Sequence, residues 1–293
     1  MTKSIILIFI MGSNFVFSIP KVVEIPYFRN DWNKIDFLEG AFYIIKTDKT
    51  PENNTKVKLS YDKKCLYIKI ICEEKKIENV VQSYTGPEIW KNDCVEIFID
   101  TNLDRKTYYQ FIISVDGQIY GWDTERTPIL KDWSAFTKKG KDYWETEIKI
   151  PFSILNISLS KGEIIGMTFC RERWAERLEL STWTPPIGFH RPKEFSLFIF
   201  GTSKDVMNKF WKIINGKLEI LNKEKGNLKI SEEIEEKINL LSEFSKETQN
   251  YLTDASFNKE NFIRWLEKFE RIKNSVKIDE IIYEIKIEKL LSK

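Results

Sequence analysis

Between about residues 20 and 201, hydrophobic and polar residues alternate with a period of mostly two. Successive side chains of a β-strand point to opposite faces, so this period predicts short strands. One hairpin is marked by Asp116-Gly117, a dipeptide that suits the positive φ of a tight turn. Strands are predicted at residues 65–72, 93–100, 108–115, 118–122, 135–138, 143–150, 164–173 and 196–200. Many short strands with turns and no long helix between them indicate a mostly β protein, an antiparallel β-sandwich or jelly roll.

After Gly201 the apolar residues recur every three or four positions, which is typical of amphipathic helices. Helices are predicted at residues 205–215, 232–252, 258–276 and 278–291, with a small hairpin formed by residues 217–220 and 227–230. We therefore predict a β-sandwich over residues 19–201 and a charged α-helical appendage over residues 202–293. Two interpretations of the appendage stay open: its helices pack on the chain itself, or they dock a partner or dimerise.

The N-terminus has the pattern of a secretory signal peptide. Lys3 precedes an apolar run that is short for a membrane span, and Val16-Phe17-Ser18 suits signal peptidase. We predict a signal peptide over residues 1–18 and a secreted, extracellular or periplasmic protein. The alternatives are an apolar first strand or an uncleaved anchor. No later stretch of the sequence is long and apolar enough to span a membrane.

Charge and composition exclude several classes of protein. The 46 Lys and Arg residues against 44 Asp and Glu give a net charge of +2, which lacks the basic excess of a nucleic-acid-binding protein. The single histidine, His190, excludes metal sites built from several histidines. The sequence has no G-x-S-x-G nucleophile motif and no glycine-rich phosphate-binding motif. The four cysteines show no C-x-x-C spacing and are predicted to be buried thiols, although an exported chain permits disulfides of undetermined pairing.

Aromatic and polar residues gather near the ends of the predicted strands. Trp90 precedes one strand, Arg171 lies near the end of another, and Trp183 and His190 follow in a proline-rich stretch. Indole rings offer flat faces to the C–H face of a sugar, and charged groups hydrogen-bond its hydroxyls. The alternative for any single tryptophan is core packing. The clustering favours a saccharide-binding site.

Several segments, taken in order, resemble the family 9 carbohydrate-binding modules. They are residues 90–100 (WKNDCVEIFID), 108–111 (YYQF), 144–155 (WETEIKIPFSIL), Trp183 and residues 189–195 (FHRPKEF). The resemblance covers about residues 21–201. It implies a β-sandwich that binds saccharides without catalysis, often at chain ends and between aromatic rings. It also implies frequent attachment to polysaccharide hydrolases and structural metal ions.

The resemblance assigns roles to individual residues. Trp90 matches one of the two tryptophans that clamp the sugar, and Glu96 matches a polar contact on the following strand. The second clamp tryptophan falls near His190, and an arginine of the family pattern is Ile112 here. Arg171, as a bidentate donor, and Trp183, as a platform, are the expected replacements. The predicted carbohydrate-binding residues are Trp90, Glu96, Arg171, Trp183 and His190, and no catalytic residue is predicted.

Asp100, Asn102 and Asp104 place oxygen ligands at alternate positions, as calcium-binding loops do. Arg105 stands where an EF-hand loop has glycine, and a turn capped by its own Asx side chains explains the pattern equally well. A structural Ca²⁺ bound by these three residues is therefore one expectation, and no other cofactor is predicted.

The sequence thus predicts an exported, non-catalytic protein that grips a sugar or polysaccharide chain end between aromatic side chains. Its expected partner is a saccharide, with no nucleic acid and no membrane span. The alternatives are a glycan-processing hydrolase or an accessory to one, a structural or adhesive envelope protein assembled by its helices, and a haem-binding, cytochrome-like sandwich that uses Met167 and His190.

Overall fold

The computed structural model describes residues 21–28, 31–183, 188–226 and 230–291. The predicted signal peptide lies outside these residues. The chain divides into two compact units, with the boundary between Gly201 and Thr202. Each unit is described by itself below.

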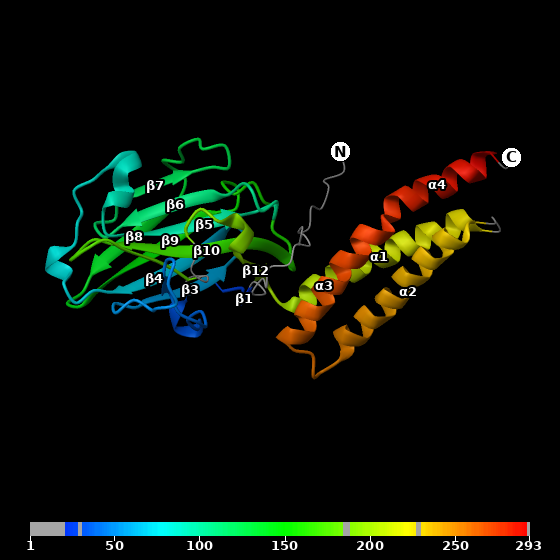
Figure 1. The fold of residues 1–293 in the computed structure, drawn as a ribbon, viewed down its shortest axis with the longest axis horizontal. Helices are drawn as coiled ribbons and strands as arrows, with labels where there is room; N and C mark the ends of the chain where they lie inside the picture. Colours follow the sequence, from blue (N-terminus) through cyan, green and yellow to red (C-terminus); the bar gives the residue numbers. More distant parts are fainter. Residues whose placement is uncertain (1–20, 29–30, 184–187, 227–229, 292–293) are drawn as a thin grey trace. The chain divides into compact units, whose positions relative to one another are not determined.

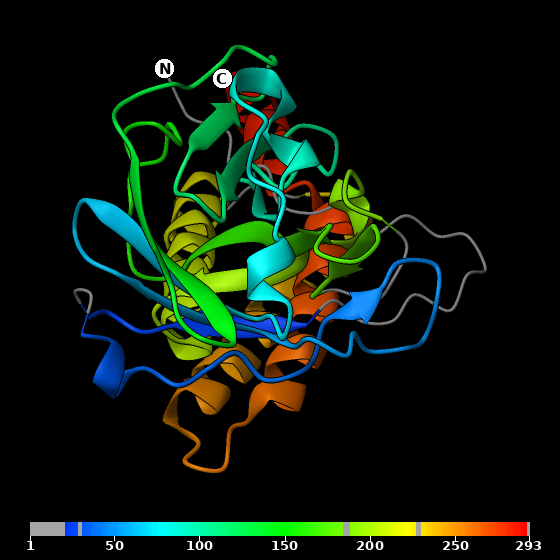
Figure 2. The same cartoon turned by 90° about the vertical axis from the view of Figure 1, so that its left-hand side faces the viewer.

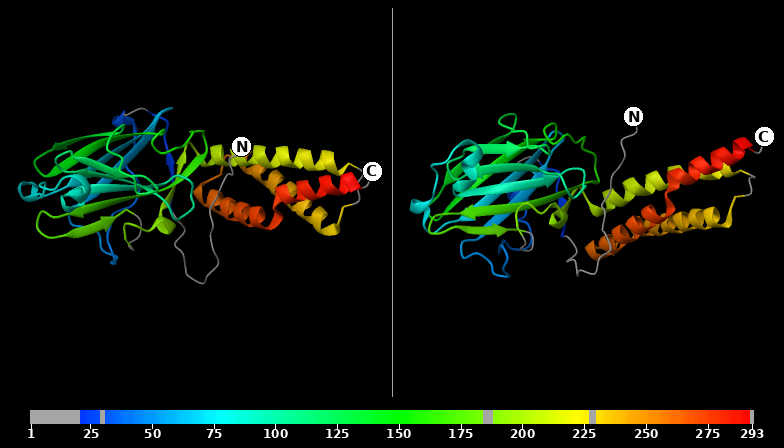
Figure 3. Two further views of the ribbon diagram at one scale, coloured as in Figure 1. Left: turned by 90° about the horizontal axis from the view of Figure 1, so that it is seen from above. Right: turned by 45° about the horizontal axis from the view of Figure 1, so that its top comes forward.

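The first unit is a β-sandwich of two sheets (Figures 1 and 3). The larger sheet has the order β1-β12-β10-β5-β6-β7, with β11 beside β10 and β2 beside β11. Its strands are β1 (Val22–Ile25), β2 (Tyr43–Ile44), β5 (Cys94–Asp100), β6 (Tyr109–Ser114), β7 (Ile119–Trp122), β10 (Glu163–Arg173), β11 (Glu179–Thr182) and β12 (Ser196–Phe200). The smaller sheet has the order β3-β4-β9-β8, with β3 (Thr55–Tyr61), β4 (Cys65–Glu73), β8 (Ser134–Lys139) and β9 (Tyr143–Pro151).

Alternation along the strands builds the core. Val95, Ile97 and Ile99 of β5 point between the sheets, where they pack with residues such as Ile68 of β4 and Trp144 of β9. Of the strand pairs in these sheets, β1–β12 is parallel and the others are antiparallel. Four short 3-10 helices, η1 (Trp32–Lys34), η2 (Ile77–Asn79), η3 (Gly86–Lys91) and η4 (Pro192–Glu194), lie in the connections. Figure 2 shows η2 and η3 (cyan) at one end of the sandwich. All four cysteines are buried free thiols.

The second unit consists of α1 (Ser203–Lys225), α2 (Glu232–Thr253), α3 (Lys259–Val276) and α4 (Ile278–Leu291). Aromatic rings of three helices form its core, with Phe210 of α1 and Phe244 of α2 packed against Trp265 and Phe269 of α3. The predicted antiparallel sandwich with a C-terminal helical appendage is therefore confirmed. Among the residues described here, no helix is long and apolar enough to cross a membrane.

The prediction for residues 205–230 was wrong in one respect. The short helix and the first strand of the predicted hairpin are both parts of α1, which continues to Lys225 and ends at Gly226. An apolar stripe that includes Phe210, Ile214 and Leu218 runs along this helix and is buried, so tertiary packing extends the helix past Gly216.

Candidate functional site

The outer face of the larger sheet carries a cluster of polar and aromatic side chains. Val95 and Ile97 point into the core, so the intervening Glu96 points outward. Glu96 is paired with Cys170 on β10 and with Ile112 on β6. Directly paired residues share a face, so these side chains also lie outside the core. Further along this face, Phe98 packs with aromatic residues of the flanking loops, including Tyr108, Phe189 and Phe195.

A continuous chain of hydrogen bonds connects Glu96 with His190. Gln110 Nε2 of β6 donates to Glu96 Oε2 at 2.7 Å, and Gln110 Oε1 accepts from Arg126 Nη1 at 3.1 Å. Arg126 Nη2 also donates to the Tyr108 hydroxyl, which lies 2.9 Å from His190 Nδ1. We call these five residues the outer-face network. It joins two of the predicted site residues, Glu96 and His190, through three that the sequence analysis did not select.

The network determines the protonation state of its histidine. Burial, together with the positive charge of Arg126, lowers the pKa of His190. Neutral imidazole is therefore favoured, and it accepts the Tyr108 hydroxyl proton at Nδ1 once that hydroxyl accepts from Arg126. The ring then carries its own proton on Nε2. His190 lies at the solvent-exposed edge of the network, and Nε2 is the ring nitrogen left to donate a hydrogen bond.

A second buried acid lies beside Glu96. Glu172 lies two positions beyond Cys170 on β10, so it shares the outer face and is a diagonal neighbour of Glu96. The two carboxyl groups hydrogen-bond to each other, and burial is the main cause that raises the pKa of both; the charge of Glu96 raises that of Glu172 further. Repulsion between two neighbouring carboxylates makes ionisation of both groups unfavourable, so the pair retains a proton. Glu96 is 2% exposed and Glu172 6% exposed, so the pair lies beneath the surface of the outer face.

Trp90 supplies an exposed ring on the same face. It belongs to η3, which is anchored by the buried Ile89 in a cluster with Cys94 and Ile112. Cys94 precedes Glu96 by two positions, so the cluster adjoins the outer-face network. The Trp90 side chain is 40% exposed. Of the five predicted site residues, the structure thus brings Trp90, Glu96 and His190 to one face.

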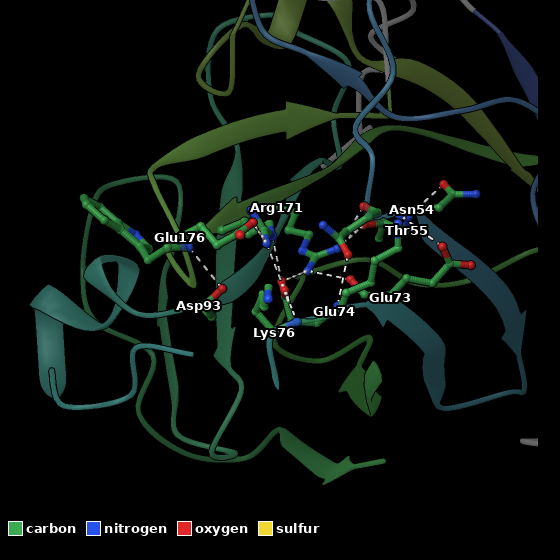
Figure 4. Close-up of polar contacts among 12 residues, drawn as sticks. Asn54, Thr55, Glu73, Glu74, Lys76, Asp93, Arg171 and Glu176 are labelled. Carbon is green, nitrogen blue, oxygen red and sulfur yellow. Dashed lines mark hydrogen bonds and ion pairs between the residues drawn. The ribbon is translucent and has the colours of Figure 1, made fainter. Parts of the chain in front are cut away.

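Arg171 lies on the opposite face of its strand and does not join them. It is 2% exposed and links the two sheets: its guanidinium donates to Glu74 Oε2 at 3.1 Å, to the Glu73 carbonyl at 2.9 Å and to Thr55 Oγ1 at 3.3 Å (Figure 4). Arg173 donates to both oxygens of Glu74 as well, at 2.7 and 2.9 Å. All the hydrogen bonds recorded for Arg171 are internal, so its placement does not support a role as donor to a sugar.

Trp183 is also part of the interior. It is 2% exposed and packs in the sandwich core against Phe169 and Phe198. One side of it borders a small hollow of about 210 Å³ that is also lined by Phe37 and Gly40. The ring lies in the core between the two sheets, whereas Trp90 lies on the outer face of the larger sheet. The structure therefore does not support the expected role of Trp183 as a platform for the sugar.

The oxygens of the proposed calcium residues are hydrogen-bonded within their own turn, except Asp100 Oδ1, which is buried and has no hydrogen-bond partner among the described residues. Asp104 Oδ1 accepts from the backbone N–H groups of Lys106 and Thr107, and Asn102 Oδ1 accepts from that of Asp104. Asp100 Oδ2 accepts from the Arg105 N–H at 3.0 Å. Within the described part of the chain, no group of three or more His, Cys, Asp or Glu side chains is placed to hold a metal ion. The oxygens fit an Asx-capped turn, and we assign no ion to them.

The haem alternative conflicts with the sheet geometry. Met167 is fully buried between the two sheets, whereas His190 is exposed beyond the outer face of the larger sheet. One iron cannot be coordinated from both sides of a sheet. The two residues therefore do not form an axial pair.

Comparison with known proteins identifies the first unit. A family model described as "Carbohydrate family 9 binding domain-like" matches residues 30–184. An exoglucanase, XynX, from Acetivibrio thermocellus and an endo-1,4-beta-xylanase A from Thermoanaerobacterium saccharolyticum are each 26% identical over 166 residues, 54% of this chain. The match spans only 14% and 13% of the length of these two relatives.

Solved structures also align with part of this chain. Family 9 carbohydrate-binding modules from Caldicellulosiruptor kristjanssonii, in complex with cellotriose and with glucose, are 20% identical, cover 62% of this chain and align with TM-scores of 0.49. A protein from Bacteroides uniformis to which carbohydrate binding is attributed is 16% identical, covers 62% of this chain and 99% of its own, and aligns with a TM-score of 0.50. Because the family model matches more than half of its residues, the chain belongs to the carbohydrate family 9 binding domain-like family.

Proposed function

We propose that this protein binds a saccharide non-catalytically on the outer face of the larger sheet, between Trp90 and His190. The observation that carries the proposal is the outer-face network, which links Glu96 to His190 beside an exposed tryptophan. Such a surface combines a flat apolar ring with oriented donors and acceptors, the two requirements for binding a sugar ring and its hydroxyls. Family 9 modules with bound cellotriose and glucose support this choice of ligand class.

Arg126 and His190 compensate for the two departures from the family pattern. Ile112 is fully buried under η3, but the guanidinium of Arg126 reaches the same face from the segment after β7 and bonds Gln110. His190 stands where a second aromatic wall is expected, and its ring packs edge-on against Phe98 at 5.1 Å between centroids. Both replacements keep the chemical type: a planar cation and a flat ring.

The carboxyl pair does not favour a glycoside hydrolase. Glycosidases hold two carboxyl groups at least about 5 Å apart, with the scissile bond between them. Glu96 and Glu172 instead interact directly with each other and are only 2% and 6% exposed, so neither is placed to reach a scissile bond. Both carboxyl groups are buried, so we propose that they hold Gln110 and the rest of the outer-face network in position for sugar hydroxyls, and that the protein is exported to act on extracellular or periplasmic glycan.

Calorimetry with cellotriose and glucose, after a glycan array on residues 19–293, tests the proposal. Trp90→Ala and Glu96→Gln should each lower affinity about tenfold or more. The first removes the ring contact, and the second removes the buried carboxylate that accepts from Gln110 and orients the outer-face network. Phe136→Ala is the matched control, because Phe136 is 69% exposed on β8 of the other sheet. Absence of any glycan ligand, or equal affinity in all three variants, would refute the proposal.

A further inference from the structure

The helical unit contains a hollow of its own, between α1 and α2. Its volume is about 600 Å³, within the usual range for ligand-binding pockets. Figures 1 and 3 show the two helices side by side in this unit. Residues that line the hollow include Trp211, Asn215, Gly216, Ser242, Ser245 and Gln249.

Small residues on both helices keep the hollow open. Gly216 lies near the middle of the 23-residue helix α1, where glycine is destabilising relative to alanine. A Cβ atom at Gly216 would meet nothing within 4 Å, and its φ is not in the left-handed region, so neither packing nor backbone geometry requires glycine there. On the facing helix, Ser242 and Ser245 contribute equally short side chains. Gly216 thus lowers the stability of α1, and its effect in the structure is to leave space between the two helices.

The walls of this space bear the side chains that bind neutral sugars. Trp211 provides a half-buried indole ring, whose N–H is itself buried and has no hydrogen-bond partner among the described residues. Asn215 is held in place by a 2.6 Å hydrogen bond from Ser245 Oγ, and Gln249 adds another amide. Amides and hydroxyls both donate and accept hydrogen bonds, as sugar hydroxyls do.

The same lining is unsuited to a partner helix. A docking helix needs an apolar stripe, but the apolar side chains of α1 and α2, such as Ile214 and Phe244, are buried inside the unit. The charged residues that line the hollow, Lys212, Glu219 and Lys246, carry both signs and so select neither a strong anion nor a strong cation.

We infer that the groove between α1 and α2 is a second saccharide-binding site, for a neutral oligosaccharide stacked on Trp211. It is separate from the outer-face network and does not depend on it. A polysaccharide long enough to reach both sites would be held at two points, which would raise its avidity beyond that of either site.

The test uses the full chain from residue 19 with Trp90→Ala and Glu96→Gln combined, so that the sheet site is weakened. A neutral-oligosaccharide array, followed by calorimetry with the best-bound glycan, measures the remaining affinity. Adding Gly216→Leu, which fills the groove with a good helix former, should lower that affinity at least tenfold; Trp211→Ala should do the same. Gly216→Ala is the control for the backbone: it should raise the melting temperature and change affinity less than the leucine variant.

The outcomes separate the two sites. If the double variant binds no glycan, or if Gly216→Leu folds and binds as before, the groove is not a saccharide site, whatever the unaltered chain does at the sheet. If light scattering shows a dimer that Gly216→Leu dissociates, a second copy of the chain occupies the groove and the inference is wrong. Circular dichroism checks that Gly216→Leu keeps its helices. If it does not, the affinity of Trp211→Ala tests the inference instead.

Discussion

At the scale of single residues, hydrogen-bond partners determine whether a buried carboxyl group is charged or neutral. Glu74 is fully buried between Arg171 and Arg173, and hydrogen bonds from Arg173 and the Lys76 N–H outweigh the effect of burial, so that the pKa of this carboxyl is lowered. The charged groups therefore compensate one another inside the sandwich. Removal of one of these three side chains leaves a buried charge without its partner. The resulting loss of folding free energy is larger than the net stabilisation that the intact group provides.

We therefore expect Glu74→Gln to destabilise the protein by about 3–5 kcal/mol, measured by denaturant unfolding at pH 7. Glu52→Gln is the control: Glu52 is exposed and pairs with Lys75 at 2.8 Å, so its substitution should leave the free energy of unfolding nearly unchanged. The lowered pKa of Glu74 contributes stability above the unfolded-state value, and this contribution disappears as pH falls through the folded value. Equal effects of the two substitutions would contradict this view of the interior.

His190 offers a direct measurement of the outer-face network, because the chain has no other histidine. Its imidazole proton resonance in NMR should titrate below the ordinary value of 6.5. Arg126→Gln removes a nearby positive charge and should raise this pKa. Arg191→Gln changes an exposed neighbour in sequence and should leave it in place. A histidine whose pKa does not respond to Arg126→Gln is not part of the network.

Strand parity explains which site residues the sequence could identify. Trp90, Glu96 and His190 were selected by type and position, and they lie on one face. Arg171 was selected for its chemistry, yet its neighbour Glu172 is the residue that shares the outer face with Glu96. The difference is one residue of register, and a one-residue shift moves a side chain to the other face of a sheet. Gln110 and Arg126 were missed because they are contributed by a neighbouring strand and a loop, whose proximity only the fold reveals.

At the scale of elements, local pattern predicted strands well and the first helix poorly. The apolar and polar pattern of β5 is sufficient to identify a strand, although the structure buries all seven of its residues. In α1, the pair Asn215-Gly216 resembles a turn, but Ile214 and Leu218 on either side are buried in the helical core and continue the helix. Whether the helix continues past Gly216 depends on the free energy of tertiary packing, which cannot be read from a short stretch of sequence.

The helix α3 contains a buried acid that its own sequence does not explain. Glu270 is 5% exposed, neither carboxylate oxygen has a hydrogen-bond partner in the described structure, and burial raises its pKa to about 7. A raised pKa means that stability is fully present below the unfolded value of about 4.5 and decreases as pH rises through 7. Glu270→Gln should thus stabilise the protein at pH 8 by about 1–3 kcal/mol and have little effect at pH 4. Thermal unfolding at both pH values measures this.

Glu267→Gln serves as the control for that experiment, because Glu267 is exposed on the same helix. It removes the same charge without relieving burial, so its effect should be small and independent of pH. A stabilisation by Glu270→Gln that is equal at pH 4 and pH 8 would show that the acid is not held neutral in the folded unit.

At the scale of the whole molecule, each of the two units has a core of its own. The sandwich buries a contiguous set of apolar residues from both sheets, and the helices bury a separate aromatic stack around Trp265. A unit with its own core and its own hydrogen-bonded elements is expected to fold alone. The family match falls within the sandwich, so saccharide binding by the outer-face network is expected to belong to this unit.

Residues 21–201, produced alone, should therefore unfold in one cooperative transition and bind glucose or cellotriose with affinity within about twofold of the full chain. A long neutral polysaccharide should distinguish the two proteins, because only the full chain has the groove between α1 and α2 and hence a second point of attachment. The expected result is equal affinity for short glycans and at least tenfold weaker binding of the long polymer by the fragment. Equal affinity for both ligands would confine saccharide binding to the sheet, and loss of the short-glycan affinity would show that the sandwich needs the helices to form its site.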